Sequence, residues 1–214
     1  MPSNATATGH SSTFPGLLLQ HAAERPQAPA MREKEYGIWQ THSWSGMATL
    51  VEHLACGLHQ AGLRQGEHLI VVGANRPRLS ATLLAAQSLG AVPIPLYQDA
   101  AAAECVFPIT NAEVRFCVVE DQEQVDKMLE VRESCPGLAH IFYDDPRGLR
   151  NYQEDGLVAV DQLLESGRAF AASQPGFFKA EVGKLRPDDV AAMFFTSGTT
   201  GNPKGVVHTH SSLI

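Results

Sequence analysis

Cysteine is scarce in this chain of 214 residues, and its cysteines are not closely spaced. No C-x-x-C pair occurs among the four cysteines, which are Cys56, Cys105, Cys117 and Cys135. Zinc sites are commonly built on closely spaced cysteine pairs, and disulfide frameworks are typical of short, cysteine-rich secreted chains, so we expect neither and expect a reducing compartment. Cys56 lies near His53 and His59 at helical spacing, but a zinc site needs a fourth ligand. We therefore interpret this group as one face of a helix.

Long apolar runs and basic stretches are also missing. No run approaches the ~18 apolar residues that span a bilayer, and the N-terminus lacks the basic and apolar regions of a secretory signal. The formal net charge of −7, with no basic stripe, argues against nucleic acid as a partner. The hydrophobic content of 44% is that of a globular protein. We expect a cytoplasmic protein without a transmembrane segment, and peripheral membrane association stays open.

Apolar segments alternate between two periodicities along the chain. Runs typical of buried strands occupy residues 69–72, 91–96, 114–119, 139–143 and 190–195. Helical spacing occupies residues 17–23, 47–62, 79–89, 100–110, 122–133 and 160–171. The alternation predicts an α/β fold, with a largely parallel sheet flanked by helices.

The remaining segments complete the expected organisation. Residues 1–13 are small and polar and are expected to be a flexible segment, while residues 14–214 form the folded part. Residues 28–31 and 36–41 are expected as two strands around a charged turn at 32–35, and residues 173–185 as irregular structure.

The stretch that follows the last apolar run carries the most chemical information. It reads Thr196-Ser-Gly-Thr-Thr-Gly-Asn-Pro-Lys-Gly205. Its glycines let the backbone approach a ligand closely, and its hydroxyls and backbone N–H groups can form an anion-binding concavity. Lys204 adds a compact positive charge. Composition alone leaves an ordinary Ser/Thr/Gly-rich surface turn as an equal alternative.

The order of the residues excludes a Walker A loop, which has the form G-x-x-x-x-G-K-[ST]. Counted from Gly198, Lys204 falls at the lysine position, but Gly205 follows it in place of Ser or Thr. The hydroxyl that would hold magnesium is therefore missing. A P-loop kinase or GTPase is excluded on this ground.

The same ten residues resemble, position by position, the phosphate-binding signature of the adenylate-forming superfamily, which includes acyl-CoA synthetases, peptide-synthetase adenylation domains and luciferases. Two upstream pieces resemble its long-chain acyl-CoA synthetase branch: His68-Leu-Ile-Val-Val-Gly-Ala-Asn-Arg-Pro77 and Ser88-Leu-Gly-Ala-Val-Pro-Ile-Pro-Leu-Tyr97. Where family members often continue with Pro-Thr, this chain has Gln98-Asp99. The resemblance implies that residues 14–214 are the N-terminal part of the family's large domain, incomplete at the C-terminus.

The resemblance also implies that the protein is an ATP-dependent ligase that joins a fatty acid to coenzyme A. The reaction would pass through an acyl-adenylate and release pyrophosphate. The residues it implies for binding the ATP phosphates are Thr196, Ser197, Gly198, Thr199, Thr200, Gly201 and Lys204. Lys204 would also be catalytic, because a positive charge stabilises the phosphates as they leave. The ligand of Mg²⁺ and the acyl pocket are expected downstream, so no metal residue is assigned and the isolated chain is expected to be inactive.

Other interpretations stay open. The chain could be a non-catalytic nucleotide- or phosphate-binding module, or part of an adenylating enzyme that uses another acid or a carrier-protein thiol. The oligomeric state is also open. His208 and His210 are expected in a packing or polar-network role after the loop rather than as bases. The pair Asp188-Asp189 is expected in a helix cap or turn rather than as a metal pair. Trp39 and Trp44 are expected to be core or interface aromatics.

Overall fold

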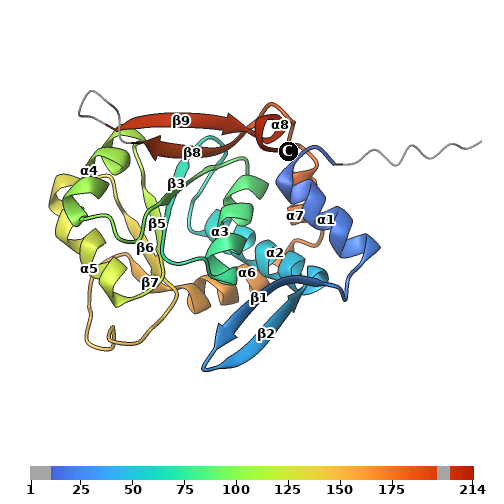
Figure 1. The fold of residues 1–214 in the computed structure, drawn as a ribbon, viewed down its shortest axis with the longest axis horizontal. Helices are drawn as coiled ribbons and strands as arrows, with labels where there is room; N and C mark the ends of the chain where they lie inside the picture. The colour runs from blue at the N-terminus through green and yellow to red at the C-terminus, as the bar shows by residue number, and fades with distance from the viewer. Residues whose placement is uncertain (1–10, 197–202) are drawn as a thin grey trace, which may run out of the picture.

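The computed structural model describes residues 11–196 and 203–214, and its centre is a sheet of five parallel strands in the order β4-β3-β5-β6-β7 (Figure 1). The strands are β3 His68–Val72, β4 Val92–Leu96, β5 Phe116–Val119, β6 His140–Tyr143 and β7 Leu157–Ala159. The chain adds β4 on one side of β3 and then β5 on the other, which is the strand order of a doubly wound α/β fold. The predicted parallel sheet is confirmed, and β7 is a strand that the sequence did not indicate.

Helices cover both faces of this sheet. On one face lie α1 Phe14–Glu24, α2 Trp44–Gln60, α3 Pro77–Ser88, α6 Val160–Ser173 and α7 Phe177–Val182. On the other lie α4 Ala102–Asn111, α5 Gln122–Val131 and the short 3-10 helix η1 Arg132–Ser134 (Figure 1). The segment expected to be irregular therefore contains α7.

The side chains of the central strands divide between two cores. Leu69 and Val71 of β3 belong to the core under α2 and α3, whereas Ile70 and Val72 belong to the core under α4 and α5. Successive residues of a strand point to opposite faces, so a run buried on both sides must be apolar at every position. This explains why β3 and β5 were visible in the sequence as unbroken apolar runs.

The first hairpin, β1 Pro29–Glu35 and β2 Ile38–Ser43, is antiparallel and lies apart from the central sheet. Its turn is formed by Tyr36 and Gly37, both with positive φ, at 46° and 83°. The turn expected at residues 32–35 is wrong, because those residues belong to β1. Alternating charges on an exposed strand have the composition of a turn, and only the backbone shows which residues reverse the chain.

The last elements are β8 Val190–Thr196, β9 Lys204–Thr209 and the short helix α8 His210–Leu213. β8 and β9 form a separate antiparallel pair, so β8 is not a strand of the parallel sheet as its apolar run suggested. Only Ala191 and Ala192 of β8 are buried, and Phe194 is 37% exposed. None of the helices in the described ranges combines the length and the apolar character that crossing a bilayer requires.

Candidate phosphate-binding site

The ends of the glycine- and hydroxyl-rich loop are held by the β8–β9 hairpin. Thr196 at the end of β8 and Lys204 at the start of β9 are cross-strand partners, and they are the last pair of the ladder. Both residues are exposed. The structure therefore brings together the two ends of the predicted site. The other predicted residues, Ser197, Gly198, Thr199, Thr200 and Gly201, lie outside the described residues.

The pair at the loop ends presents donors to solvent. Directly opposite residues of an antiparallel pair lie on the same face, so the Thr196 hydroxyl and the Lys204 ammonium belong to one face of the hairpin. Within the described ranges, no carboxylate lies at salt-bridge distance from Lys204. An exposed ammonium without an acidic partner, beside a hydroxyl, fits the phosphate oxygens of a nucleotide.

The inner face of the hairpin is packed on the core beneath α4. Met193 and Phe195 pack against that core, and the Phe195 ring meets the Phe107 ring of α4 edge to face, with centroids 6.1 Å apart. Gly205 lies opposite Phe195, and a Cβ at Gly205 would be 3.1 Å from the Met193 sulfur. The glycine after Lys204 therefore admits these two large side chains.

The outer end of the hairpin is fixed by His210, which is 1% exposed. Its Nδ1 accepts a hydrogen bond of 3.3 Å from the backbone N–H of Phe14, whose ring lies 5.6 Å away. Burial lowers the pKa of His210, so the neutral ring that can accept this bond is favoured. Before β8, Asp189 accepts a hydrogen bond of 2.7 Å from the Arg186 N–H. The expected network and turn roles are thus confirmed for His210 and Asp189.

One residue that anchors the hairpin was missed by sequence analysis. Gln87 of α3 is 7% exposed, and its Nε2 donates a hydrogen bond of 2.8 Å to the carbonyl of Ala191 in β8. A glutamine among the alanines and leucines of α3 was a signal, because a buried amide needs a polar partner. β9 itself was also missed, although the β-branched Val206 and Val207 after Gly205 are typical of a second hairpin strand.

The carboxyl ends of β3, β5 and β6 are occupied by ion pairs. After β5, Glu120 accepts hydrogen bonds from the Ala74 N–H at 2.5 Å and from Arg76 Nε at 3.0 Å. After β6, Asp144 lies 2.8 Å from Nε of Arg78. Burial raises the pKa of Asp144 to about 6, while Arg78 opposes the shift.

These ion pairs line a polar cavity of about 640 Å³, and no described residue of the predicted loop borders it. The two described ends of the loop, Thr196 and Lys204, belong to the β8–β9 hairpin and not to the parallel sheet. The loop follows the carboxyl end of β8, a strand of a separate hairpin.

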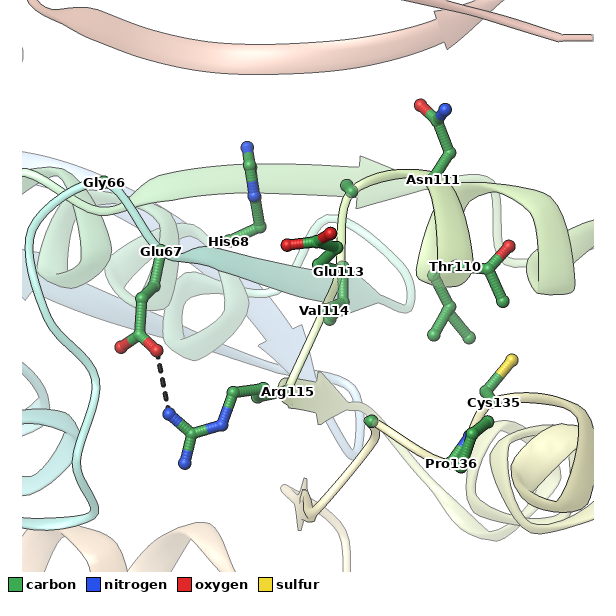
Figure 2. A pocket seen from close by; sticks show the side chains of 13 residues that line it. Gly66, Glu67, His68, Thr110, Asn111, Glu113, Val114, Arg115, Cys135 and Pro136 are labelled. Atoms are coloured by element: carbon green, nitrogen blue, oxygen red, sulfur yellow. Dashed lines mark hydrogen bonds and ion pairs between the residues drawn. The ribbon is translucent and has the colours of Figure 1, made fainter.

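Another cavity, of about 590 Å³, lies at the amino ends of the central strands (Figure 2). His68 at the start of β3 and Arg115 just before β5 border it, and Arg115 forms an ion pair of 2.8 Å with Glu67. The Cys135 thiol also borders it, and burial raises its pKa, which makes it a poor nucleophile. Thr196 and Lys204 are absent from its lining.

The histidines and cysteines of residues 11–196 and 203–214 form no metal centre. In the two described ranges, no group of three or more His, Cys, Asp or Glu side chains is arranged to hold a metal ion. Cys56 is fully buried, and burial raises its pKa to about 11. Trp44 is half-buried against the core below α2, whereas Trp39 is 63% exposed and is no core residue.

Comparison with known proteins gives a consistent family match. The model of the AMP-binding enzyme family matches residues 18–214. The chain is 25% identical over 206 residues to the long-chain-fatty-acid–CoA ligase FadD15 of Mycobacterium bovis. This match covers 96% of the chain and 32% of that protein. It is 27% identical over 175 residues to 4-coumarate–CoA ligase 4 of Arabidopsis thaliana, with 80% of this chain and 28% of that protein covered.

A solved structure shows the same arrangement. The N-terminal domain of FACL13 from Mycobacterium tuberculosis, in an inhibitor-bound crystal structure, superposes with a TM-score of 0.70 at 26% identity. The match covers 92% of this chain and 44% of that chain. The chain spans about a third of the length of the curated relatives it matches.

Proposed function

The chain belongs to the AMP-binding enzyme family, and on this premise we propose that it carries the ATP-phosphate-binding loop of an acid–CoA ligase. The ligase would join a carboxylic acid to ATP, form an acyl-adenylate with release of pyrophosphate, and pass the acyl group to coenzyme A. The ordered signature of residues 196–205, whose ends Thr196 and Lys204 are partners across a hairpin, is the observation that carries this proposal. Residues 14–214 would form the N-terminal part of the catalytic domain.

The residues at the loop ends have separate roles in this proposal. The Thr196 hydroxyl would donate to a phosphate oxygen, and the Lys204 ammonium would stabilise negative charge on the departing phosphates. Both roles require exposed donors on one face of the hairpin. Gln87 and His210 would keep this face in place without touching the nucleotide.

A fatty acid is the acid we propose. Relatives named as long-chain-fatty-acid–CoA ligases support this choice. Because another relative is named as a 4-coumarate–CoA ligase, aryl acids are the alternative substrates to test. ATP would act with Mg²⁺, whose ligand we place outside this chain. A panel of fatty and aryl acids, with coenzyme A or a phosphopantetheine carrier protein as acceptor, would decide between these substrates in the longer enzyme.

The phosphate-binding role can be tested on the chain itself. Titration with Mg²⁺–ATP, followed by calorimetry, should show binding that weakens by about tenfold in Lys204→Ala, because a charge-assisted phosphate contact is lost. Lys184→Ala is the matched control, since Lys184 is an exposed lysine that pairs with Glu181 outside the hairpin. Equal binding by the wild type and Lys204→Ala would remove the lysine from this role.

The described loop ends, a hydroxyl and an ammonium, account for phosphate binding alone, so a second candidate is a nucleotide- or phosphate-binding module without catalytic activity. Acid-dependent ATP–pyrophosphate exchange distinguishes the two. We expect no exchange by residues 1–214 alone, and in a longer enzyme that contains them we expect Lys204→Ala to lower exchange by about 10²-fold or more. Robust exchange by the 214-residue chain would show that these residues suffice for adenylation.

A further inference from the structure

A groove of about 340 Å³ is bordered by residues of α1, α2, α3 and β1. α1 and β1 both pack against α3 (Figure 1). None of the described residues that line the groove is charged, and most of them are leucine, methionine or aromatic residues. An apolar groove without a charged wall accepts a neutral apolar molecule and offers an ionised group no partner.

The walls of the groove are half-buried, which distinguishes it from a flat protein-docking face. Trp44, Leu83 and Leu84 pack against the core and stay partly accessible. None of the lining residues is among the exposed large hydrophobic residues of the described chain. A cavity of about 150 Å³ holds one benzene molecule, so the 340 Å³ of this groove correspond to roughly a dozen carbon atoms. The groove therefore suits one small molecule with an apolar body.

One buried acceptor at the groove has no partner. Gln87 of α3 borders the groove and is 7% exposed. Its Nε2 donates to the Ala191 carbonyl, while its Oε1 is buried and has no hydrogen-bond partner among the described residues. Because a carbonyl oxygen only accepts, the amide cannot be turned round to satisfy Oε1. A buried acceptor without a donor is costly, so a ligand that supplies an O–H or N–H gains affinity at this point.

The groove also borders two of the contacts that hold the β8–β9 hairpin. Phe14 lines it, and the Phe14 N–H donates to His210, which follows β9. Gln87 lines it as well and donates to Ala191 in β8. A ligand that packs against Phe14 and Gln87 favours the conformation in which both bonds are formed. Occupancy of the groove should therefore stabilise the hairpin.

We propose that this groove binds a neutral ligand with an apolar body of about a dozen carbons and one hydroxyl or amide N–H donor, such as a medium-chain primary alcohol. The chain would pack against Met31, Leu83 and Leu84, and the donor would bond to Oε1 of Gln87. An ionised carboxylate does not fit this chemistry, because the groove offers it an acceptor oxygen and no cation. The ligand is therefore of another class than the acid of the proposed function, and the proposal stands independently of that function.

Tryptophan quenching tests whether the ligand enters the groove. Trp39→Phe leaves Trp44, which lines the groove, as the only tryptophan. Undecanol brominated at its methyl end should quench the Trp44 emission in a saturable manner, because bromine quenches an indole that it contacts. Unbrominated undecanol should compete and restore the emission. Emission without saturable quenching would overturn the proposal.

Three probes of matched length separate the donor from the chain. By calorimetry, undecanol should bind about tenfold more tightly than its methyl ether, which keeps the chain but has no donor. Undecanoate at about pH 8, where the carboxylate is ionised, should also bind more weakly than undecanol. Equal affinity for the alcohol and the ether, or tighter binding of the carboxylate, would overturn the assigned ligand class.

Variants of the lining locate the site. Leu83→Trp fills the groove and should weaken undecanol binding at least about tenfold, and Ala30→Leu repeats this test from β1. Leu164→Trp is the matched control, because Leu164 is a half-buried leucine of α6 that does not line the groove. In Gln87→Met the alcohol and the ether should bind equally. Circular dichroism verifies that each variant is folded, and unchanged affinity in both filling variants would overturn the site.

Hydrogen exchange tests the link between the groove and the hairpin. Saturating undecanol should slow exchange at amides of β8 and β9 more than at amides of β5, because the ligand packs against Phe14 and Gln87. The effect should disappear in Leu83→Trp. Saturable binding with unchanged exchange in β8 and β9 would overturn the proposed stabilisation of the hairpin.

Discussion

The central strands of the five-stranded sheet and β8 of the β8–β9 hairpin are both rich in apolar residues, but they bury these residues to different extents. In the sheet, β3 and β5 are buried on both faces, and every residue of β5 is almost inaccessible. In the hairpin, only the inner face is packed, while Phe194, Val206 and Val207 remain 37%, 39% and 50% exposed. The sheet is therefore a scaffold, and the hairpin is an attachment that presents the loop.

This difference shows what stabilises each part. A two-stranded ribbon is marginally stable by itself, so the hairpin depends on its contacts with neighbouring elements. Those contacts include β8 against β4 of the sheet, Gln87 with Ala191, Phe107 with Phe195, and His210 with Phe14. The sheet depends on two cores to which all five strands and most helices contribute.

The largest expected effect comes from truncating one phenylalanine in each region. Phe116→Ala in β5 should lower the free energy of unfolding by about 3–5 kcal/mol, because a fully buried ring leaves a cavity. Phe194→Ala in β8 should cost below about 1 kcal/mol, because its ring is already partly in water. Urea unfolding monitored by far-UV circular dichroism measures both. Equal losses would mean that the hairpin is integrated as tightly as the sheet.

The same contrast explains which strands the sequence revealed. Residues buried on both sides give unbroken apolar runs, so β3, β4, β5 and β6 were predicted close to their observed bounds. β7 has only three residues and α7 only six, too few for either periodicity to be recognised. β8 was found as a strand, but an apolar run does not specify which strand will pair with it.

The candidate site was less accessible to prediction than the fold. The residue order of the signature indicated phosphate binding, and the hairpin now places its ends Thr196 and Lys204 opposite each other. Gln87 was not predicted, because its partner is a backbone carbonyl of Ala191, 104 residues away in sequence. Long-range contacts of that kind leave no periodic trace in the sequence.

A second comparison uses two glycines. Gly167 of α6 lies against the backbone of α2, and a Cβ there would overlap the carbonyl oxygen of His53 and approach the Gly57 nitrogen to 2.7 Å. Gly167→Ala should force the two helices apart and cost about 1–3 kcal/mol. Gly205→Ala in the hairpin should cost less, because its nearest neighbour is the flexible Met193 side chain at 3.1 Å. Thermal unfolding of both variants tests the ranking, and the reverse order would contradict it.

The carboxylate of Asp144 at the parallel sheet predicts a pH dependence opposite in sign to the one that the buried His210 predicts at the hairpin. Burial raises the pKa of Asp144 from 3.8 to about 6, so the folded state binds its proton more tightly than the unfolded chain does. As the pH falls from about 7 to about 4, this residue should raise the free energy of unfolding by on the order of 1–2 kcal/mol. Unfolding in urea at a series of pH values, compared with Asp144→Asn, isolates this contribution, which the variant should lack.

The neighbouring aspartate supplies a control of opposite sign. Arg147 lowers the pKa of Asp145, so its contribution to stability is present at neutral pH and is lost as the pH falls. On acidification, Asp145→Asn should therefore lose less stability than the wild type does. Asp144→Asn should lose more, because it lacks the stabilising protonation of Asp144. Variants that change the pH profile in the same direction would contradict the assignment of Asp144.

The smallest effect concerns a hydrogen bond that holds the hairpin to α3. Gln87→Met keeps the volume of the side chain but leaves the Ala191 carbonyl without its donor, which should cost about 1 kcal/mol. Because that carbonyl belongs to β8, hydrogen exchange should accelerate at amides of β8 and β9 and stay unchanged in β3 and β5. Ser88→Ala is the matched control, since its buried hydroxyl bonds within α3 to Leu84, at 2.7 Å. Exchange that accelerates equally in both regions would mean that the hairpin and the sheet unfold as one unit.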